Sequence, residues 1–168
     1  MLPKRSLMGP GPSDVYPEVL AAMARPTIGH LDPAFVDFMD ELNELLRYAF
    51  QTKNTVTLPI SAPGSAGMEC VFVNLLEPGD KVIIASNGVF GGRMLENARR
   101  CGANPVVVEF EWGTPVDPGK VEEALKANPD AVALAFVHSE TSTGVRSDAK
   151  TLCKLAQDNG CLAIVDAV

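Results

Sequence analysis

The sequence predicts an α/β fold in which a mostly parallel sheet carries helices on both faces. From about residue 55 onward, short runs rich in β-branched residues alternate with segments of helical periodicity. Strong turn sequences, such as Glu77-Pro-Gly-Asp80, separate these segments. No internal repeat, low-complexity tract or linker interrupts the alternation. Strands spaced by helices in this way are typical of parallel sheets that are covered on both sides.

Residues 1–54 are expected to form an N-terminal arm and helix. The segment Gly9-Pro-Gly-Pro-Ser13 cannot lie in a helix or a central strand, because its prolines lack N–H donors and its glycines allow unusual dihedral angles. A short helix is predicted at residues 17–24. A longer one is predicted at residues 33–51, with Asp32 as its N-cap and a proline in first place. Its broad apolar stripe indicates either core packing or a contact between subunits.

Residues 55–168 are expected to form the sheet and its helices as a second domain. This order of elements lets a helix connect each strand to the next parallel one. The predicted strands lie at residues 55–60, 81–85, 105–109, 131–137 and 161–165. The predicted helices lie at residues 65–76, 90–101, 117–127 and 147–159.

Composition and charge exclude several function classes. The chain has 168 residues, one domain's worth, with 46% hydrophobic and 21% charged residues, as in ordinary globular proteins. Its net charge of −7 argues against binding to nucleic acid or to an anionic membrane. The four cysteines are scattered and have no histidine at ligand spacing, which predicts reduced thiols and no metal site. No apolar run is long enough to span a membrane and no signal peptide is evident, so we expect a soluble cytoplasmic protein, with an organellar matrix as the open alternative.

The segments that follow the predicted strands carry the chemistry, because ligands of open α/β sheets bind beyond the carboxyl ends of the strands. The first strand leads into residues 61–69, a small-residue loop at the start of a helix, where backbone N–H groups and the helix dipole can hold a phosphate. The second leads to Phe90 between glycines. The strand at 131–137 leads to the hydroxyl-rich residues 138–144, and the last strand leads to Asp166.

Together these strand ends describe a site for a flat, phosphorylated, basic heteroaromatic ligand. Pyridoxal phosphate fits that description, because a carboxylate at its ring nitrogen keeps the nitrogen protonated and the ring able to accept electrons. For residues 61–69 alone, an ordinary turn with Ser65 as the helix N-cap is an equally good interpretation.

Eight short segments match one protein family in order and cover nearly the whole chain. They are Gly9-Pro-Gly-Pro-Ser13, Gly29-His30 with Asp32-Pro33, Phe50-Gln-Thr-Lys-Asn54, Gly64-Ser-Ala-Gly-Met-Glu69, Leu76-Glu-Pro-Gly-Asp80, Asn87-Gly-Val-Phe-Gly91, His138-Ser-Glu-Thr-Ser-Thr-Gly144 and Val165-Asp166. With these segments the chain resembles the N-terminal half of a class V, fold-type I pyridoxal-phosphate aminotransferase of the alanine–glyoxylate and serine–pyruvate group. The resemblance implies that residues 55–168 are an incomplete, cofactor-binding large domain of that fold.

The resemblance implies a role for each residue of the cofactor site. Gly64 and Ser65, at the start of a helix, would bind the phosphate group. Phe90 would stack on the pyridine ring, and Thr141 would form a hydrogen bond near the phenolic-oxygen or nitrogen side of the ring. Asp166 would form the salt bridge to the pyridinium nitrogen, and it is the one catalytic residue expected in the chain.

The sequence departs from the family pattern in two of these places. Pro63 stands where relatives often have a hydroxyl residue, so the phosphate loop has one backbone donor fewer. Phe90 stands where relatives often have tryptophan, which leaves less area for stacking. The backbone around Gly11 is expected near the substrate carboxylate, and Glu140 receives no role.

The resemblance implies pyridoxal-phosphate-dependent transamination between alanine or serine and glyoxylate or pyruvate, carried out by a homodimer. The family's Schiff-base lysine lies beyond the position of Asp166, and the sequence ends at Val168. We therefore expect the 168 residues to be the N-terminal part of a longer enzyme and to be inactive alone. Two alternatives stay open: another class V enzyme of the lyase or desulfurase type, and a non-catalytic α/β module that binds a phosphorylated ligand.

Overall fold

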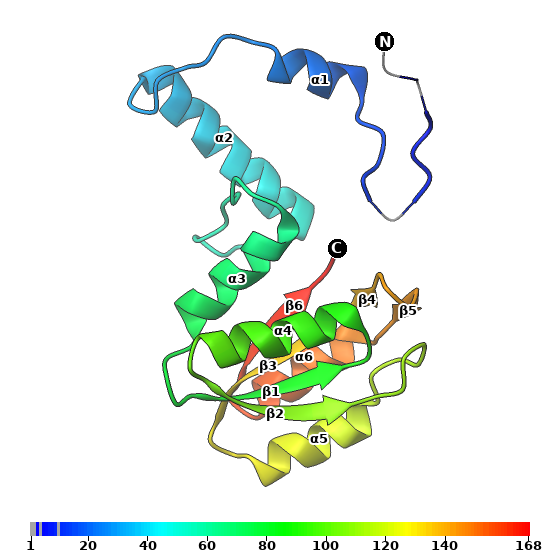
Figure 1. The fold of residues 1–168 in the computed structure, drawn as a ribbon. Coiled ribbons are helices and arrows are strands. Elements are labelled where there is room, and N and C mark those ends of the chain that lie inside the picture. Colours follow the sequence, from blue (N-terminus) through cyan, green and yellow to red (C-terminus); the bar gives the residue numbers. More distant parts are fainter. Residues whose placement is uncertain (1–2, 4, 10) are drawn as a thin grey trace. The chain divides into compact units, whose positions relative to one another are not determined.

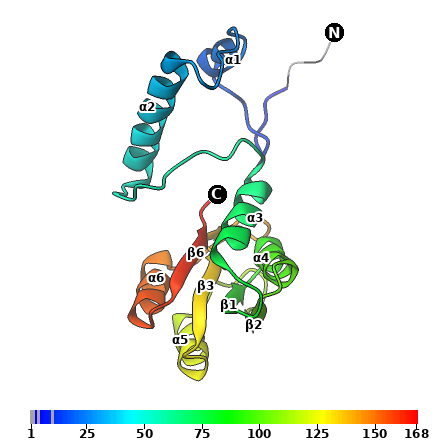
Figure 2. The same cartoon turned by 90° about the vertical axis from the view of Figure 1, so that its left-hand side faces the viewer.

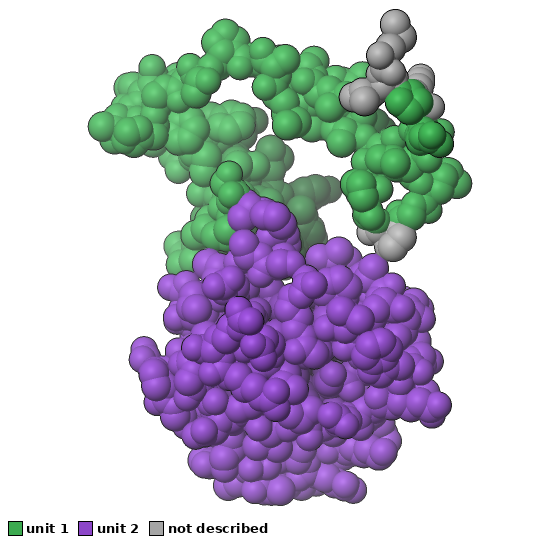
Figure 3. All heavy atoms as spheres, viewed as in Figure 1, with its two compact units in different colours: residues 1–61 green, residues 62–168 purple. Residues whose placement is uncertain are grey.

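The computed structural model describes residues 3, 5–9 and 11–168. The chain divides into two compact units, Met1–Ser61 and Ala62–Val168 (Figure 3). The domain boundary expected between residues 54 and 55 stays a prediction. Within the described ranges, no helix is both long enough and apolar enough to cross a membrane.

The first unit holds two helices, α1 at Pro17–Met23 and α2 at Pro33–Phe50 (Figure 1). The predicted start of α2 is confirmed, because the Asp32 carboxylate accepts a hydrogen bond from the Ala34 amide at 2.9 Å and a proline occupies the first turn. The residue after the helix, Gln51, is its C-cap, and its φ of 52° places it in the left-handed region that closes many helices. None of its side chains is buried within the chain.

The strand predicted at residues 55–60 is wrong. These residues have no regular secondary structure, and no strand in the described part of the chain pairs with them. A strand exists only through hydrogen bonds to a neighbour, and Pro59 removes one of the donors that such pairing needs. The apolar side chains of the segment, those of Val56, Leu58 and Ile60, are exposed.

The second unit is built on a parallel four-stranded sheet with the order β2-β1-β3-β6 (Figure 2). The central strands β1 and β3 are almost entirely buried, as their continuous apolar runs require in a sheet covered on both sides. The four strands fall within one residue of their predicted ends. Their bounds are Lys81–Ser86 for β1, Asn104–Glu109 for β2, Ala131–Val137 for β3 and Leu162–Asp166 for β6.

Helices cover both faces of this sheet, as predicted, and each face has its own core (Figures 1 and 2). Successive side chains of β1 point to opposite faces of the sheet and so contribute to both cores. Val82 and Ile84 face one core, and Ile83 and Ala85 face the other. The first core is closed by α3 and α4 and the second by α5 and α6. The helices span Gly64–Leu75 for α3, Val89–Arg100 for α4, Pro118–Ala127 for α5 and Ala149–Asp158 for α6.

A small antiparallel hairpin follows β3 and was not predicted. It pairs β4, Ser139–Glu140, with β5, Val145–Arg146. The turn between them closes through a hydrogen bond from the Gly144 amide to the Glu140 carbonyl oxygen at 2.8 Å, and the φ of Gly144 is 73°, a conformation that favours glycine. The hairpin carries the hydroxyl-rich motif and holds it at the carboxyl edge of the sheet.

Candidate functional site

One cavity of about 180 Å³ is lined by residues from α3, α4, the turn of the hairpin and the end of β6. Its lining residues are Gly64, Ser65, Met68, Phe90, Arg93, Thr141, Asp166 and Val168. The structure thus brings together all five residues that the sequence assigned to a cofactor, from α3, α4, the hairpin and β6. Gly11 belongs to the other unit, so its proximity to a substrate carboxylate stays a prediction.

One end of the cavity is formed by the first turn of α3. The helix begins at Gly64 with Pro63 in the N-cap position, so the interpretation of Ser65 as the N-cap is wrong. The Pro63 carbonyl oxygen accepts a hydrogen bond from the Ala66 amide at 2.8 Å. The amides of Gly64 and Ser65 precede any intrahelical acceptor, and the described residues offer them none. Two backbone donors and the positive end of the helix dipole therefore face this end of the cavity.

Arg93 adds a full positive charge at the same end. Its guanidinium donates a hydrogen bond to Ser65 Oγ at 2.5 Å and lies 4.9 Å from the centroid of the Phe90 ring. Phe90 and Arg93 are three residues apart on α4, so they share one face of the helix. Sequence analysis missed Arg93. The signal available was this spacing from the predicted stacking residue.

The middle of the cavity is formed by Phe90 and Thr141, and a buried carboxylate joins the segments that carry them. Glu140 is fully buried. Its Oε2 accepts hydrogen bonds from the amides of Phe90 at 3.2 Å and Gly91 at 3.3 Å. Its Oε1 accepts hydrogen bonds from the Ser142 amide at 3.1 Å and from Ser142 Oγ at 2.6 Å. The sequence assigned Glu140 no role, because two of its partners, the amides of Phe90 and Gly91, lie about fifty residues away in α4.

Asp166 lines the cavity at the end of β6 and is partly buried. Its carbonyl oxygen accepts a hydrogen bond from the His138 amide at 2.8 Å, which continues the pairing of β3 with β6. Its Oδ1 accepts one from the Val168 amide at 3.2 Å. The cavity thus has N–H donors for an anion at α3, an aromatic ring on α4, a hydroxyl on the hairpin and this carboxylate on β6. Together these groups fit a flat, phosphorylated ring with a cationic nitrogen.

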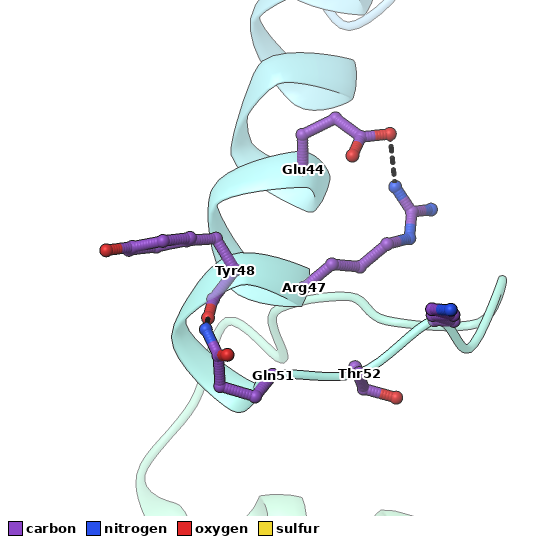
Figure 4. Close-up of a pocket in the computed structure, with 6 residues that line it drawn as sticks. Glu44, Arg47, Tyr48, Gln51 and Thr52 are labelled. Carbon is purple, nitrogen blue, oxygen red and sulfur yellow. Dashed lines mark hydrogen bonds and ion pairs between the residues drawn. The ribbon is translucent and has the colours of Figure 1, made fainter.

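A second, wider hollow lies at the end of α2, within the first unit (Figure 4). Its only arginine is already engaged. The Arg47 guanidinium forms an ion pair with Glu44 at 2.7 Å and donates hydrogen bonds to the carbonyl oxygens of Asn54 and Thr55 at 3.1 and 3.0 Å. These contacts fasten the segment that leaves α2, so we assign the hollow a structural role.

The aminotransferase class-V family model matches residues 12–168. The (S)-ureidoglycine–glyoxylate transaminase of Bacillus subtilis is 44% identical over 167 residues, which cover 99% of this chain and 40% of that protein. The alanine–glyoxylate aminotransferase of Rattus norvegicus is 40% identical over 167 residues, with the same shares of the two chains. The chain thus spans about two fifths of the length of these curated relatives.

Solved structures agree in fold. The ureidoglycine–glyoxylate aminotransferase of Bacillus subtilis superposes with a TM-score of 0.96 at 42% identity, covering 100% of this chain and 43% of that one. The alanine–glyoxylate aminotransferase of Nostoc sp. superposes with a TM-score of 0.93 at 42% identity, covering 98% and 44%. The predicted fold class and the resemblance stated from the sequence are both confirmed.

The close contact between the start of α4 and the hairpin predicts that a side chain at Gly88 destabilises the fold. A Cβ atom there would come within 2.5 Å of Glu140 Cδ and 2.7 Å of Ser142 Oγ. Gly88→Ala should therefore lower the free energy of unfolding by about 1–3 kcal/mol, measured by urea denaturation. Gly92→Ala is the matched control, because a Cβ there meets no atom within 4 Å, and the better helix former should stabilise α4 by up to about 1 kcal/mol. Equal stabilities of the two variants would contradict the close contact.

Proposed function

The chain belongs to the aminotransferase class-V family, and we propose that it forms the N-terminal part of an enzyme that transfers amino groups with pyridoxal 5′-phosphate. The observation that carries the proposal is the single cavity that collects Gly64, Ser65, Phe90, Thr141 and Asp166. These residues come from separate segments of the chain, and they are the ones for which the family resemblance implies contacts with this cofactor.

When bound, pyridoxal phosphate supplies an electron sink for the bonds at the amino-acid α-carbon. The amides of Gly64 and Ser65 bind its phosphate at the positive end of α3. Phe90 would pack against one face of its ring. Thr141 orients the ring by a hydrogen bond to its polar edge.

Arg93 adds hydrogen-bond donors at the phosphate end of the cavity, which compensates for the N–H group that Pro63 lacks. Its contact with Ser65 Oγ leaves the hydroxyl proton of Ser65 free to donate toward an anion, since the oxygen already accepts. The guanidinium itself can donate charge-assisted hydrogen bonds to phosphate oxygens. Two amides, a hydroxyl and a cation then face the anion.

Asp166 performs the catalytic role in this part of the chain. Its carboxylate holds a proton on the ring nitrogen, and partial burial makes that interaction stronger than it would be in water. The two ends of the site therefore carry opposite charges, which would fix the orientation of the cofactor. Positive groups of α3 and α4 take the phosphate, and the negative group of β6 takes the cationic edge of the ring.

For substrates we propose glyoxylate, with pyruvate as the second choice, as the amino acceptor, and alanine or serine as the donor. The names of the transaminases that resemble this chain support glyoxylate, because it appears in both. A homodimer is also proposed. Exposed apolar side chains along α2, among them Phe38, Leu45 and Phe50, support a contact between subunits.

Replacement of Asp166 tests the catalytic assignment. In the protein that carries this chain, Asp166→Asn should lower the rate of the first half-reaction with the amino donor by about 100-fold or more, because the ring nitrogen loses its anionic partner. Stopped-flow absorbance of the bound cofactor measures this rate. Glu109→Gln is the matched control, since Glu109 also ends a strand, β2, but does not line the cavity. A fall of equal size in both variants would contradict the assignment. A transaminase would leave the amino group on the cofactor at the end of this half-reaction, whereas a lyase or desulfurase would not.

Replacement of Arg93 tests the phosphate end. Arg93→Gln should weaken binding of pyridoxal phosphate by about 10- to 100-fold, the range of a hydrogen bond to a charged group. Binding of pyridoxal, which has no phosphate, should change little. Equilibrium titration of both compounds gives the two dissociation constants. Arg100→Gln serves as control, because Arg100 lies on the same helix but pairs with Glu96 in solvent. Equal losses for both compounds would show that Arg93 does not recognise the phosphate.

A further inference from the structure

We infer that Glu140 is a positioning residue of the cofactor site, which fixes Phe90 and Thr141 relative to each other; the inference rests on the proposed function. In the proposed site the two residues would contact different parts of the ring, its face and its edge. They come from segments about fifty residues apart in the chain. Only a connection between α4 and the hairpin can hold both contacts in one geometry, and Glu140 supplies it.

The burial of Glu140 shows that its contacts are specific. A fully buried carboxylate is unfavourable unless hydrogen bonds or charges compensate it. Among the described residues no lysine or arginine pairs with it. Four donors do so instead, two amides of α4 and the amide and hydroxyl of Ser142. The positive end of the α4 dipole adds to this compensation.

These hydrogen bonds hold Thr141 on both sides. Its neighbours Glu140 and Ser142 both contact the start of α4. Glu140 accepts hydrogen bonds from the amides of Phe90 and Gly91. Ser142 Oγ accepts one from the Val89 amide at 3.0 Å. The turn residue Thr141 therefore cannot move away from α4 without breaking contacts on one side or the other.

The position requires a carboxylate. All four partners donate, so an amide at residue 140 would place its NH₂ group against an N–H donor on one side. Gly88 makes room for the side chain, because a Cβ there would collide with it. The same contacts also cap α4, so a purely structural role is the competing explanation. The experiment has to separate the two.

Glu140→Gln, studied in the protein that carries this chain, provides the test. We expect the dissociation constant of pyridoxal phosphate to rise by about 10- to 100-fold, because misplacement of contact groups by an ångström has effects of that size. The induced circular dichroism of the bound cofactor should change as well, since it reports how the ring is held. Combined with Phe90→Ala, the substitution should weaken binding less than it does alone, because one of the two contacts that it positions is already gone.

Ala98→Gly is the control for stability. It weakens the last turn of α4 at a buried residue that does not line the cavity. It should lower the unfolding midpoint and leave both the dissociation constant and the dichroism unchanged. If Glu140→Gln fails to fold, Ser142→Ala replaces it, since it removes only the hydroxyl contacts. Its loss of affinity should be smaller and equally non-additive with Phe90→Ala.

Three results would overturn the inference. The first is a folded Glu140→Gln protein, or Ser142→Ala in its place, with unchanged affinity and dichroism. The second is a loss of affinity that adds fully to that of Phe90→Ala. The third is a loss that Ala98→Gly reproduces, because such a loss reflects stability alone. A parent protein that binds no pyridoxal phosphate would instead overturn the proposed function itself, so the two failures are distinguishable.

Discussion

The parallel alignment of β1, β3 and β6 is the constraint on which the site depends. Ala85 pairs with Phe136 and Val137 pairs with Asp166, so the three strands end at one level. The segments that follow these strands therefore begin at the same edge of the sheet. Residues from the beginning of α4, from the hairpin and from the end of β6 thus meet in one cavity, although they lie far apart in the chain.

The N-termini of two helices give this edge of the sheet a positive electrostatic potential. The starts of α3 and α4 both lie on this side of the sheet, and each carries a partial positive charge. The start of α3 is left open for an external anion, whereas that of α4 is satisfied within the chain by Glu140. One helix start can therefore bind a ligand, and the other holds the site together.

Much of this was predictable from local sequence. The buried strands have uninterrupted apolar runs, and Gly64, Phe90 and Asp166 stand near strand ends or at a helix start, so they could be predicted to lie at one edge of the sheet. The role proposed for each of them toward a cofactor came from the resemblance to the family. The segment at residues 55–60 could not be judged in the same way. Its apolar pattern suits a strand, but a strand also needs a neighbour, and pairing is not a local property.

Arg93, Glu140 and the β4–β5 hairpin depend on contacts that the sequence does not display. Glu140 looks like one polar residue among several, and only the fold places it under the amides of α4. Arg93 looks like a solvated helix residue until α3 is seen beside α4. Strands of two residues are too short for any periodicity to reveal.

A crystal structure of the protein that carries this chain, grown with pyridoxal phosphate, tests the central claim most directly. The account predicts phosphate oxygens at the amides of Gly64 and Ser65 and near the Arg93 guanidinium. It also predicts that the ring nitrogen lies about 2.7–2.9 Å from an Asp166 oxygen, as in a charge-assisted hydrogen bond. A phosphate bound elsewhere, or a ring nitrogen that faces no carboxylate, would contradict it.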